Sequence, residues 1–338
     1  MPFHIPAATI NQIKTALDKA KHILVITHIA PDGDALGSLT AVGLALDQLK
    51  KKHTLVCDDG TLERFNYLAL TNSIKDIIPT DPIDLVISVD CADASRMGKA
   101  YDHLPSPKPF TINIDHHITN TNFGNINLVI SEAKSTTEIL ADLFPHLQVN
   151  LSHALATSLL TGLVTDTLCF RIPGVTASTL GTASRLIEAG ANLFDVTTQG
   201  LLLRPLSTLK LWQIGLNNMR EENGFVWTTI SYADRDAIGL AEGKATGLVN
   251  ALSDTYQAYI GAVLWEQADG TIIVSFRCHP PYTVSELAVN LGGGGHDLAA
   301  GCTIDGPLNK AEQLVIDLAK ANIRKQQGIF YQHGHNHG

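Results

Sequence analysis

Cysteine is scarce in this chain of 338 residues, and the spacing of the cysteines suits neither a cysteine metal site nor a redox-active cysteine pair. The five cysteines, Cys57, Cys91, Cys169, Cys278 and Cys302, are odd in number and include no Cys-x-x-Cys pair. This pattern argues against a zinc ribbon and against the disulfide framework of a small secreted protein. We therefore expect reduced thiols and a cytoplasmic protein.

Long hydrophobic runs and excess positive charge are also lacking. No apolar stretch approaches the roughly 20 residues of a membrane span, and the first residues, MPFHIPAATINQIK, do not form a signal peptide. Lys and Arg number 24 against 33 Asp and Glu, which gives a formal net charge of −9. Because affinity for long nucleic acids comes mostly from many basic contacts to phosphates, we expect neither long nucleic acid nor a membrane as partner.

Apolar residues make up 45% of the chain, enough for the cores of two domains. Helical and strand patterns alternate from residue 8 onward: helices are predicted over 8–20, 34–49, 136–145 and 176–190, and strands over 22–27, 54–56, 84–89 and 110–114. This rhythm predicts an α/β fold whose first domain has a largely parallel sheet with helices on both faces. The stretch 152–165 fits a helix by its length and a strand by its apolar end.

The pattern changes after Gly190. We expect a first domain over 1–193, a helical linker over 194–222 interrupted at Pro205, a smaller α/β domain over 223–328 and a His-rich disordered tail over 329–338. Within the smaller domain, strands are predicted at 225–231, 258–266 and 271–277, followed by a glycine run at 292–295 and a helix at 310–326.

Acidic and histidine side chains stand where apolar runs end. The strand at 110–114 leads into Asp115, His116 and His117, the strand at 22–27 into His28, Asp32 and Asp34, the strand at 84–89 into Asp90, and the run 159–165 into Asp166. Since the carboxyl ends of parallel strands share one edge of a sheet, we expect these side chains to converge there. Such a convergence predicts a metal site.

The candidate ligands are four carboxylates and two imidazoles: His28, Asp32, Asp34, Asp90, His116 and Asp166. Such a set suits Mn²⁺ or Mg²⁺ better than a thiolate-binding metal, and six ligands suggest two ions that share a carboxylate. Two ions about 3.5 to 4 Å apart can generate a hydroxide and clamp the oxygens of a phosphoryl displacement. Asp34 by itself could be only a helix cap. A purely structural role would, however, have to apply separately at each of the four segment ends, and burying this much charge without a cation is costly.

These spaced motifs resemble those of the DHH family of phosphoesterases. The segment His28-Ile-Ala-Pro-Asp32-Gly-Asp34 resembles the first motif, Val89-Asp90 the second, Asp115-His116-His117 the third and Val164-Thr165-Asp166-Thr167 the fourth, with Ser135-Thr136-Thr137-Glu138 similar to the segment between the last two. In the smaller domain, Ser275-Phe276-Arg277 and the sequence GGGGHDLAAG over 292–301 resemble the DHHA1 substrate-binding domain.

The resemblance implies two Mn²⁺ ions, with Mg²⁺ or Co²⁺ as alternatives. It places one ion on His28, Asp32 and Asp90, and the other on Asp34, Asp90, His116 and Asp166, so that Asp90 bridges them. It further implies that Asp115 supports the His116 imidazole. His117 is then expected to contact phosphate or to act as a general acid.

A second anion site is expected in the smaller domain. The four successive glycines, Gly292, Gly293, Gly294 and Gly295, would let backbone N–H groups approach an anion closely. His296 follows them, and the guanidinium of Arg277 can bind phosphate through two parallel hydrogen bonds. A flexible turn is the simpler interpretation of the glycines taken alone.

The resemblance implies a Mn²⁺-dependent phosphodiesterase of the branch that contains nanoRNases and pAp phosphatases. Such an enzyme would hydrolyse short oligoribonucleotides and linear dinucleotides (pApA, pGpG) to mononucleotides, and 3′-phosphoadenosine 5′-phosphate (pAp) to AMP. One alternative is a cyclic-dinucleotide (c-di-AMP) phosphodiesterase. Another is a non-catalytic nucleotide- or RNA-binding protein, although such a protein would usually lack a metal ligand and none is missing here. The sequence leaves open which substrate is preferred and whether the chain forms a homodimer.

Overall fold

The structure is a computed structural model that describes residues 3–242 and 247–334. Its contacts divide the chain into two units, Met1–Leu203 and Arg204–Gly338. Of the segment predicted as a linker, α7 (Leu193–Thr197) and a π-helix (Thr198–Leu202) belong to unit 1, whereas α8 (Leu206–Asn217) and β6 (Arg220–Glu222) belong to unit 2. Of the predicted tail, residues 335–338 lie outside the described residues, and the last helix continues to Gly334.

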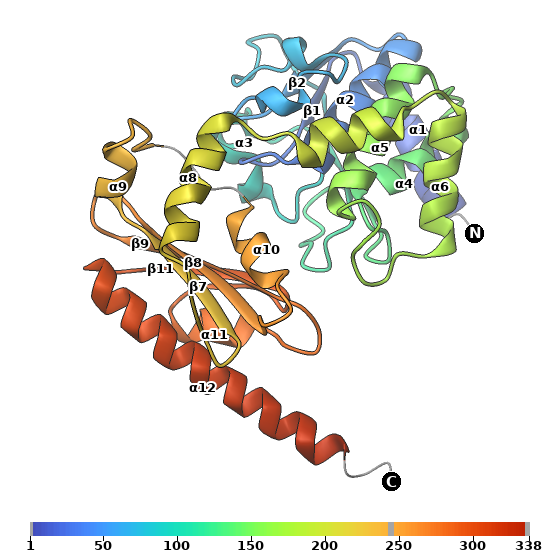
Figure 1. The fold of residues 1–338 in the computed structure, drawn as a ribbon. Helices are drawn as coiled ribbons and strands as arrows, with labels where there is room; N and C mark the ends of the chain where they lie inside the picture. Colours follow the sequence, from blue (N-terminus) through green and yellow to red (C-terminus); the bar gives the residue numbers. More distant parts are fainter. Residues whose placement is uncertain (1–2, 243–246, 335–338) are drawn as a thin grey trace. The chain divides into compact units, whose positions relative to one another are not determined.

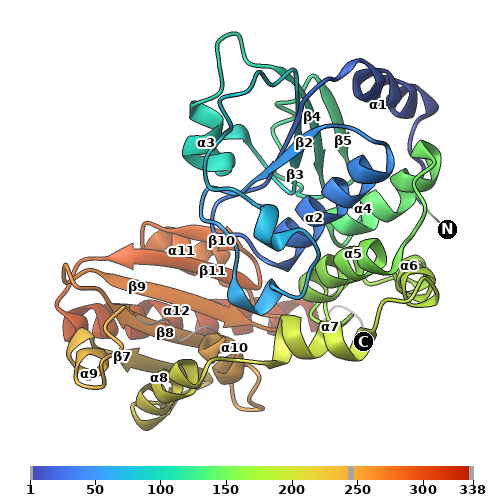
Figure 2. The same cartoon turned by 90° about the horizontal axis from the view of Figure 1, so that it is seen from above.

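Unit 1 is built on a parallel five-stranded sheet with the order β2-β1-β3-β4-β5. The strands β2, β3, β4 and β5 are labelled in Figure 2. Its strands are β1 (Ile23–Ile26), β2 (His53–Val56), β3 (Leu85–Val89), β4 (Phe110–Asp115) and β5 (Ile126–Val129), and each neighbouring pair is parallel. The α/β prediction for this domain is confirmed. The edge strand β5 was not predicted.

Helices cover both faces of this sheet. The larger face carries α1 (Ala7–Lys19), α2 (Gly33–Gln48), α4 (Thr136–Leu143), α5 (His153–Asp166) and α6 (Ala177–Glu188), and the other face carries α3 (Gly98–Asp102). Short 3₁₀-helices lie at Glu63–Phe65, Thr71–Ser73, Ala94–Met97 and Phe144–Leu147. Val25 and Ile87 face the larger core, while Leu24 and Val86 face the smaller one with Met97. These strands are therefore apolar on both faces, as is typical of parallel sheets.

The ambiguous stretch at 152–165 forms helix α5. Ser152 caps it by accepting a hydrogen bond from the Leu155 N–H, and the helix is apolar on nearly all sides because it is buried among α2, α4 and α6. Burial all round removes the polar stripe that marks a surface helix. Asp166 consequently stands at the end of a helix and not at the end of a strand.

Helices α2 and α5 approach each other through glycines. A Cβ on Gly37 would lie 2.6 Å from the Ser158 carbonyl oxygen, and a Cβ on Gly162 would lie 2.3 Å from Oδ1 of Asp34. Both distances are too short for any side chain, so the two backbones touch where other residues would hold them apart. This contact brings the start of α2 beside α5.

Unit 2 is built on a six-stranded sheet with the order β10-β11-β9-β8-β7-β6, in which only β7 and β8 are parallel. After β6 come β7 (Phe225–Ile230), β8 (Ile260–Glu266), β9 (Ile272–Cys278), β10 (Gly294–His296) and β11 (Ala299–Ile304). The helices are α8, α9 (Tyr232–Asp236), α10 (Leu248–Ser253), α11 (Ser285–Asn290) and α12 (Leu308–Gly334). The three predicted strands are present, whereas β6, β10 and β11 were not predicted.

The two faces of this second sheet are covered differently. Helices α11 and α12 pack on the face that carries Val274 and Phe276, and Figure 1 shows α12 running along the sheet. On the opposite face, α8 and α10 share an apolar cluster with β7 and β8, which includes Leu252 and Val263. On β9, β11 and β10 this opposite face carries the residues that alternate with the core residues, among them Arg277. No described helix is both long and apolar enough to span a membrane.

Candidate metal centre and anion site

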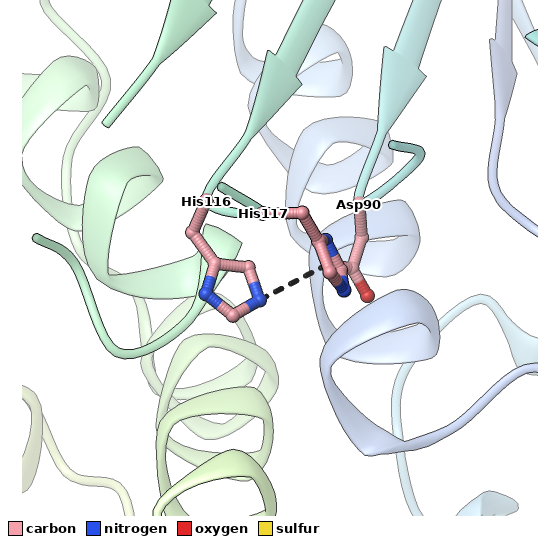
Figure 3. Close-up of side chains that lie close together, drawn as sticks. All are labelled: Asp90, His116 and His117. Carbon is pink, nitrogen blue, oxygen red and sulfur yellow. Dashed lines mark ion pairs between the residues drawn. The ribbon is translucent and has the colours of Figure 1, made fainter. Parts of the chain in front are cut away.

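Three adjacent strands of unit 1 end in predicted site residues. His28 follows β1, Asp90 follows β3, and Asp115 ends β4 just before His116. Figure 3 shows His116 and His117 leaving the end of β4 towards Asp90. Asp90 has a left-handed backbone, with a φ of 60°, and its N–H donates to the Ile114 carbonyl oxygen. Such a conformation is uncommon for a residue other than glycine and is found where the surrounding structure imposes it, often at functional sites.

Asp32 and Asp34 divide two roles at the start of α2. Oδ1 of Asp32 accepts hydrogen bonds from the N–H groups of Asp34 and Ala35, each at 3.0 Å, so Asp32 is the helix cap. The alternative that Asp34 serves only as the cap is therefore wrong. Asp34 is fully buried, and its side chain faces the start of α4.

The start of α4 holds two of the carboxylates. The N–H groups of Thr136 and Thr137 donate to Asp34 at 2.6 and 3.0 Å, and the Thr137 hydroxyl donates to the same side chain at 2.8 Å. The Thr136 hydroxyl donates to Oδ1 of Asp90 at 3.0 Å. From the sequence, the segment 135–138 was recognised only by its similarity to the family segment between the last two motifs. The signal that could have revealed its role is a pair of hydroxyl side chains directly after the Ser135 cap, where helix N–H groups are free for acceptors.

The side chains gather into three overlapping groups whose potential ligand atoms lie within 4.8 Å of one another: His28 with Asp32 and Asp90, Asp34 with His116 and Asp166, and Asp90 with His116 and His117. Nε2 of His28 lies 3.4 Å from Oδ2 of Asp90, and Nε2 of His116 lies 3.6 Å from Oδ1 of Asp90 and 3.3 Å from Oδ2 of Asp166. Asp90 thus stands between the histidines of β1 and β4. All six predicted ligands are brought into this cluster.

The charges of the cluster shift one another strongly. Burial and the nearby carboxylates of Asp90 and Asp166 raise the pKa of Asp34, and burial with the charges of Asp32 and Asp90 raises the pKa of Asp166 to about 6. Burial alone would lower the pKa of His28, but its contact with Asp90 outweighs this and raises the pKa to about 9. The carboxylates therefore repel one another and attract positive charge.

The donor set fits divalent cations. Nε2 of His116 is buried without a hydrogen-bond partner among the described residues, although two carboxylates face it. An unpartnered imidazole nitrogen beside carboxylate oxygens is the arrangement that a metal ion would complete. The neighbouring Cys91 is buried and burial raises the pKa of its thiol, so this sulfur is not a competing thiolate ligand. Oxygen with some nitrogen ligation suits Mn²⁺ or Mg²⁺.

Asp115 supports a different histidine from the one we expected. Its Oδ1 lies 2.8 Å from Nδ1 of His117, and its Oδ2 accepts a hydrogen bond from the Asn120 side chain at 2.5 Å. The expectation that Asp115 orients His116 is wrong. In an extended chain, residues two apart point to the same side, so Asp115 meets His117 while His116 turns towards Asp90 and Asp166.

The predicted anion residues lie together on one face of the unit 2 sheet. In the register of β10, β11 and β9, His296 is opposite Ala299, and Ala299 is opposite Arg277. Arg277 is half-buried, with burial lowering its pKa, and His296 is exposed. The glycine run is not a free N–H cradle along its whole length. Gly292 and Gly293 donate their N–H groups to the carbonyl oxygens of Val289 and Ala288 at the end of α11.

Comparisons with known proteins agree with this architecture. Residues 22–163 match the N-terminal domain of the DHH family, and residues 229–325 match the DHHA1 domain. A bifunctional oligoribonuclease and PAP phosphatase of Thermus thermophilus is 30% identical over 90% of this chain and 90% of its own length. A cyclic-di-AMP phosphodiesterase of Geobacillus thermodenitrificans is 25% identical over 90% of this chain, which spans 48% of that relative. The crystal structure of an exopolyphosphatase-related protein of Bacteroides fragilis has the same fold, with a TM-score of 0.86 at 20% identity over 97% of this chain and 99% of that one.

Proposed function

The chain belongs to the DHH family of phosphoric ester hydrolases and carries a DHHA1 domain, and we propose that it is a Mn²⁺-dependent phosphodiesterase for very short nucleotides. Its substrates are short oligoribonucleotides and linear dinucleotides such as pApA and pGpG, which it hydrolyses to mononucleotides, and pAp, which it hydrolyses to AMP. The relative from Thermus thermophilus, a bifunctional oligoribonuclease and PAP phosphatase, supports this substrate class.

The observation that carries the proposal is the position of Asp90 between two sets of ligand atoms. We assign one Mn²⁺ to His28, Asp32 and Asp90, and the other to Asp34, Asp90, His116 and Asp166. The groups formed by these side chains support the assignment. Two divalent ions held by these residues would supply a water of lowered pKa and would neutralise the charge that develops on the phosphate.

Other residues of unit 1 position the ligands and contact the substrate. Asp115 and the first turn of α4 hold side chains of the cluster in place through hydrogen bonds. Because Nδ1 of His117 is hydrogen-bonded to Asp115, Nε2 is the nitrogen of the His117 ring that is available to contact the substrate. The hydrogen bond to Asp115 raises the pKa of His117, which favours the protonated ring. We assign His117 to contact the phosphate and to donate a proton to the leaving oxygen.

Unit 2 supplies the residues that bind the nucleotide. Arg277 and His296 lie on one face of the sheet, separated by the small Ala299. A guanidinium that is partly withdrawn from water binds a phosphate more strongly than an exposed one, because less water must be displaced. We assign these two side chains, together with the glycines of 292–295, to the terminal phosphate and the adjoining nucleoside.

A cyclic dinucleotide is the second candidate substrate, since a c-di-AMP phosphodiesterase is among the relatives. A cyclic dinucleotide has no terminal phosphate, so its second phosphate would bring one negative charge to an anion site at Arg277 and His296, where a terminal phosphate brings about 1.5 to 2. This chemistry favours the linear substrates. A non-catalytic binding protein is disfavoured, because all six predicted ligands are present and lie together.

The proposal is tested by measuring kcat/KM for pAp, pApA, pGpG, longer RNA and c-di-AMP side by side with Mn²⁺. We expect pAp and the linear dinucleotides to be hydrolysed faster than longer RNA and c-di-AMP. A parallel series with Mg²⁺ and Co²⁺ tests the choice of metal. Absence of hydrolysis with every substrate and metal would contradict an enzyme, and a preference for c-di-AMP would replace the proposed substrate with the cyclic one.

A further inference from the structure

A groove lies at the edge of the unit 1 sheet that is opposite the metal centre. It has a volume of about 580 Å³ and is lined by one side of α1 and by residues at the starts of β3, β4 and β5. Sites for small organic ligands usually measure about 300 to 1,000 Å³, so the groove has a suitable size. Phe110 begins β4 in the groove and Asp115 ends the same strand at the metal centre, so five residue steps, or about 17 Å, separate the two sites.

The groove combines an apolar wall with an accessible aromatic ring. Leu85 and Ile126, at the starts of β3 and β5, are buried and line it. Ala16 and Ala20 line it from the side of α1, where longer side chains would take up the space. Phe110 is 46% exposed, whereas the other residues of β4 are buried. An exposed aromatic ring beside an apolar wall offers a surface on which a flat ring can stack.

Three carboxamide side chains also line the groove: Asn11 and Gln12 on α1, and Asn125 directly before β5. Oδ1 of Asn125 accepts a hydrogen bond from the Thr111 N–H at 2.8 Å, and this contact fixes the orientation of the amide. The NH₂ group of Asn125 has no hydrogen-bond partner among the residues that the structure describes. Carboxamides bind the edge of a nucleobase well, because they donate and accept side by side.

The groove also contains a lysine whose charge is not paired. Lys19, in the last turn of α1, forms no ion pair within the described part of the chain. Asp84 lines the groove too, but its carboxylate already accepts hydrogen bonds from the N–H groups of Lys21 and His22. An ammonium group in this position favours a ligand that carries a negative charge, such as a phosphate.

We propose that this groove is a second nucleotide site, which binds a nucleoside monophosphate away from the metal centre. The base stacks on Phe110, the Asn125 amide donates to an acceptor at the edge of the base, and the Lys19 ammonium binds the phosphate. The lining of the groove carries this inference, which goes beyond the proposed function and does not require hydrolysis. A chain that releases mononucleotides would meet such a ligand as its own product.

The first test is calorimetric titration of the Mn²⁺-loaded protein with AMP, for wild type, Phe110→Ala and Phe194→Ala. Phe194 is the matched control, because it is an exposed phenylalanine of α7 in the same unit and does not line the groove. We expect Phe110→Ala to weaken AMP binding at the groove roughly tenfold, as for the loss of one stacking contact. The Phe194→Ala variant should bind AMP as wild type does.

Two further variants test the polar contacts. Asn125→Asp keeps an acceptor for the Thr111 N–H but loses the NH₂ donor, so it should weaken AMP binding without a change in melting temperature. Lys19→Gln removes the positive charge, so it should weaken the binding of AMP and leave the binding of adenosine unchanged. Equal loss of AMP and adenosine in Lys19→Gln would contradict a phosphate contact at this residue.

Photolabelling with 8-azido-AMP, followed by mass spectrometry of the peptides, locates the site. We expect label on the peptides of α1 in wild type and its loss in Phe110→Ala, while both proteins hydrolyse bis(p-nitrophenyl) phosphate equally. Label confined to other peptides would overturn the inference, as would equal AMP affinity in wild type and folded Phe110→Ala. If wild type hydrolyses no nucleotide, the proposed function fails, and label on α1 would still support the groove.

Discussion

The two candidate sites of this chain are built in opposite ways. In unit 1, charged side chains are withdrawn from water and each is held by a neighbour: Asp34 by α4, Asp90 by Thr136 and two histidines, and His117 by Asp115. In unit 2, one arginine and one exposed histidine flank a surface of glycine and alanine. Under the proposed function, the first arrangement fixes charges for chemistry, and the second leaves space for a ligand.

This contrast predicts how substitutions divide. Changes in the unit 1 cluster should reduce the hydrolysis of every phosphate ester, because all of them pass through the same reacting centre. Changes in the unit 2 face should affect mainly KM, and only for substrates that carry a nucleotide beyond the scissile phosphate. A unit 1 variant that affects only nucleotide substrates, or a unit 2 variant that affects every phosphate ester, would contradict this contrast between the two sites.

The largest effect is expected for Asp90→Asn. Asp90 belongs to two of the three ligand groups, so its loss should exceed the roughly 10- to 100-fold cost of losing a residue that merely supports a metal ligand. We expect kcat to fall more than about 100-fold on both pApA and bis(p-nitrophenyl) phosphate. Asp81→Asn is the matched control, because Asp81 is an exposed partner of Lys52. If Asp90→Asn is about as active as Asp81→Asn, Asp90 is not part of the catalytic site.

The next effect is expected at Thr137, which holds Asp34 through both its N–H and its hydroxyl. Thr137→Val keeps the shape but removes the hydroxyl donor, so calorimetric titration with Mn²⁺ should show affinity reduced by about 10- to 100-fold. Thr137→Ser retains the hydroxyl and should restore most of it. A merely structural role predicts a lower melting temperature without a change in Mn²⁺ affinity, and that result would show that Thr137 does not position a ligand.

A moderate effect is expected at Arg277. Arg277→Ala removes the half-buried guanidinium and should raise KM for pApA by roughly tenfold or more, since hydrogen bonds to charged groups contribute about 1.5 to 3 kcal/mol. Arg277→Lys should recover only part of the loss, because an ammonium does not offer two parallel donors. Steady-state kinetics on pApA and bis(p-nitrophenyl) phosphate check both variants. A full recovery by lysine would argue against a bidentate contact.

The smallest effect concerns stability and tests how the unit 1 cluster is held together. Gly37→Ala forces a methyl against the Ser158 carbonyl between α2 and α5 and should lower the free energy of unfolding by about 1 to 3 kcal/mol. Gly181→Ala, in the exposed surface of α6 with no described heavy atom near its Cβ, should raise it by about 0.5 to 1 kcal/mol. Denaturant unfolding measures both. Equal effects would mean that the α2–α5 contact is not tightly packed.

The sequence predicted those site residues that follow short apolar strands. His28, Asp90 and the Asp115–His117 triplet each stand where the hydrophobic pattern stops, so parallel strands were enough to bring them to one edge. Asp166 was harder, because a helix that is buried on all sides has the same continuous apolar pattern as a buried strand. The pairing of Asp115 with His117 was within reach, since alternate residues of an extended chain share a side.

Other features depend on tertiary contacts that no local pattern reports. Thr136 and Thr137 meet Asp34 across about a hundred positions of the chain, and only packing of α4 beside α2 makes these hydrogen bonds. The strand β10 consists of two glycines and a histidine, residues with little strand preference, and it forms because β11 offers an edge. The same contact explains why Gly293 and Gly295 must be glycines, since a Cβ on either would collide with β11.

The comparison between the two sites is tested most directly by one ratio, kcat/KM for pApA divided by kcat/KM for bis(p-nitrophenyl) phosphate, measured for Thr137→Val and Arg277→Ala against wild type. The division of labour predicts that Thr137→Val lowers both rate constants and leaves the ratio unchanged, whereas Arg277→Ala lowers the ratio by roughly tenfold or more. An unchanged ratio in Arg277→Ala, or the same fall in both variants, would contradict it.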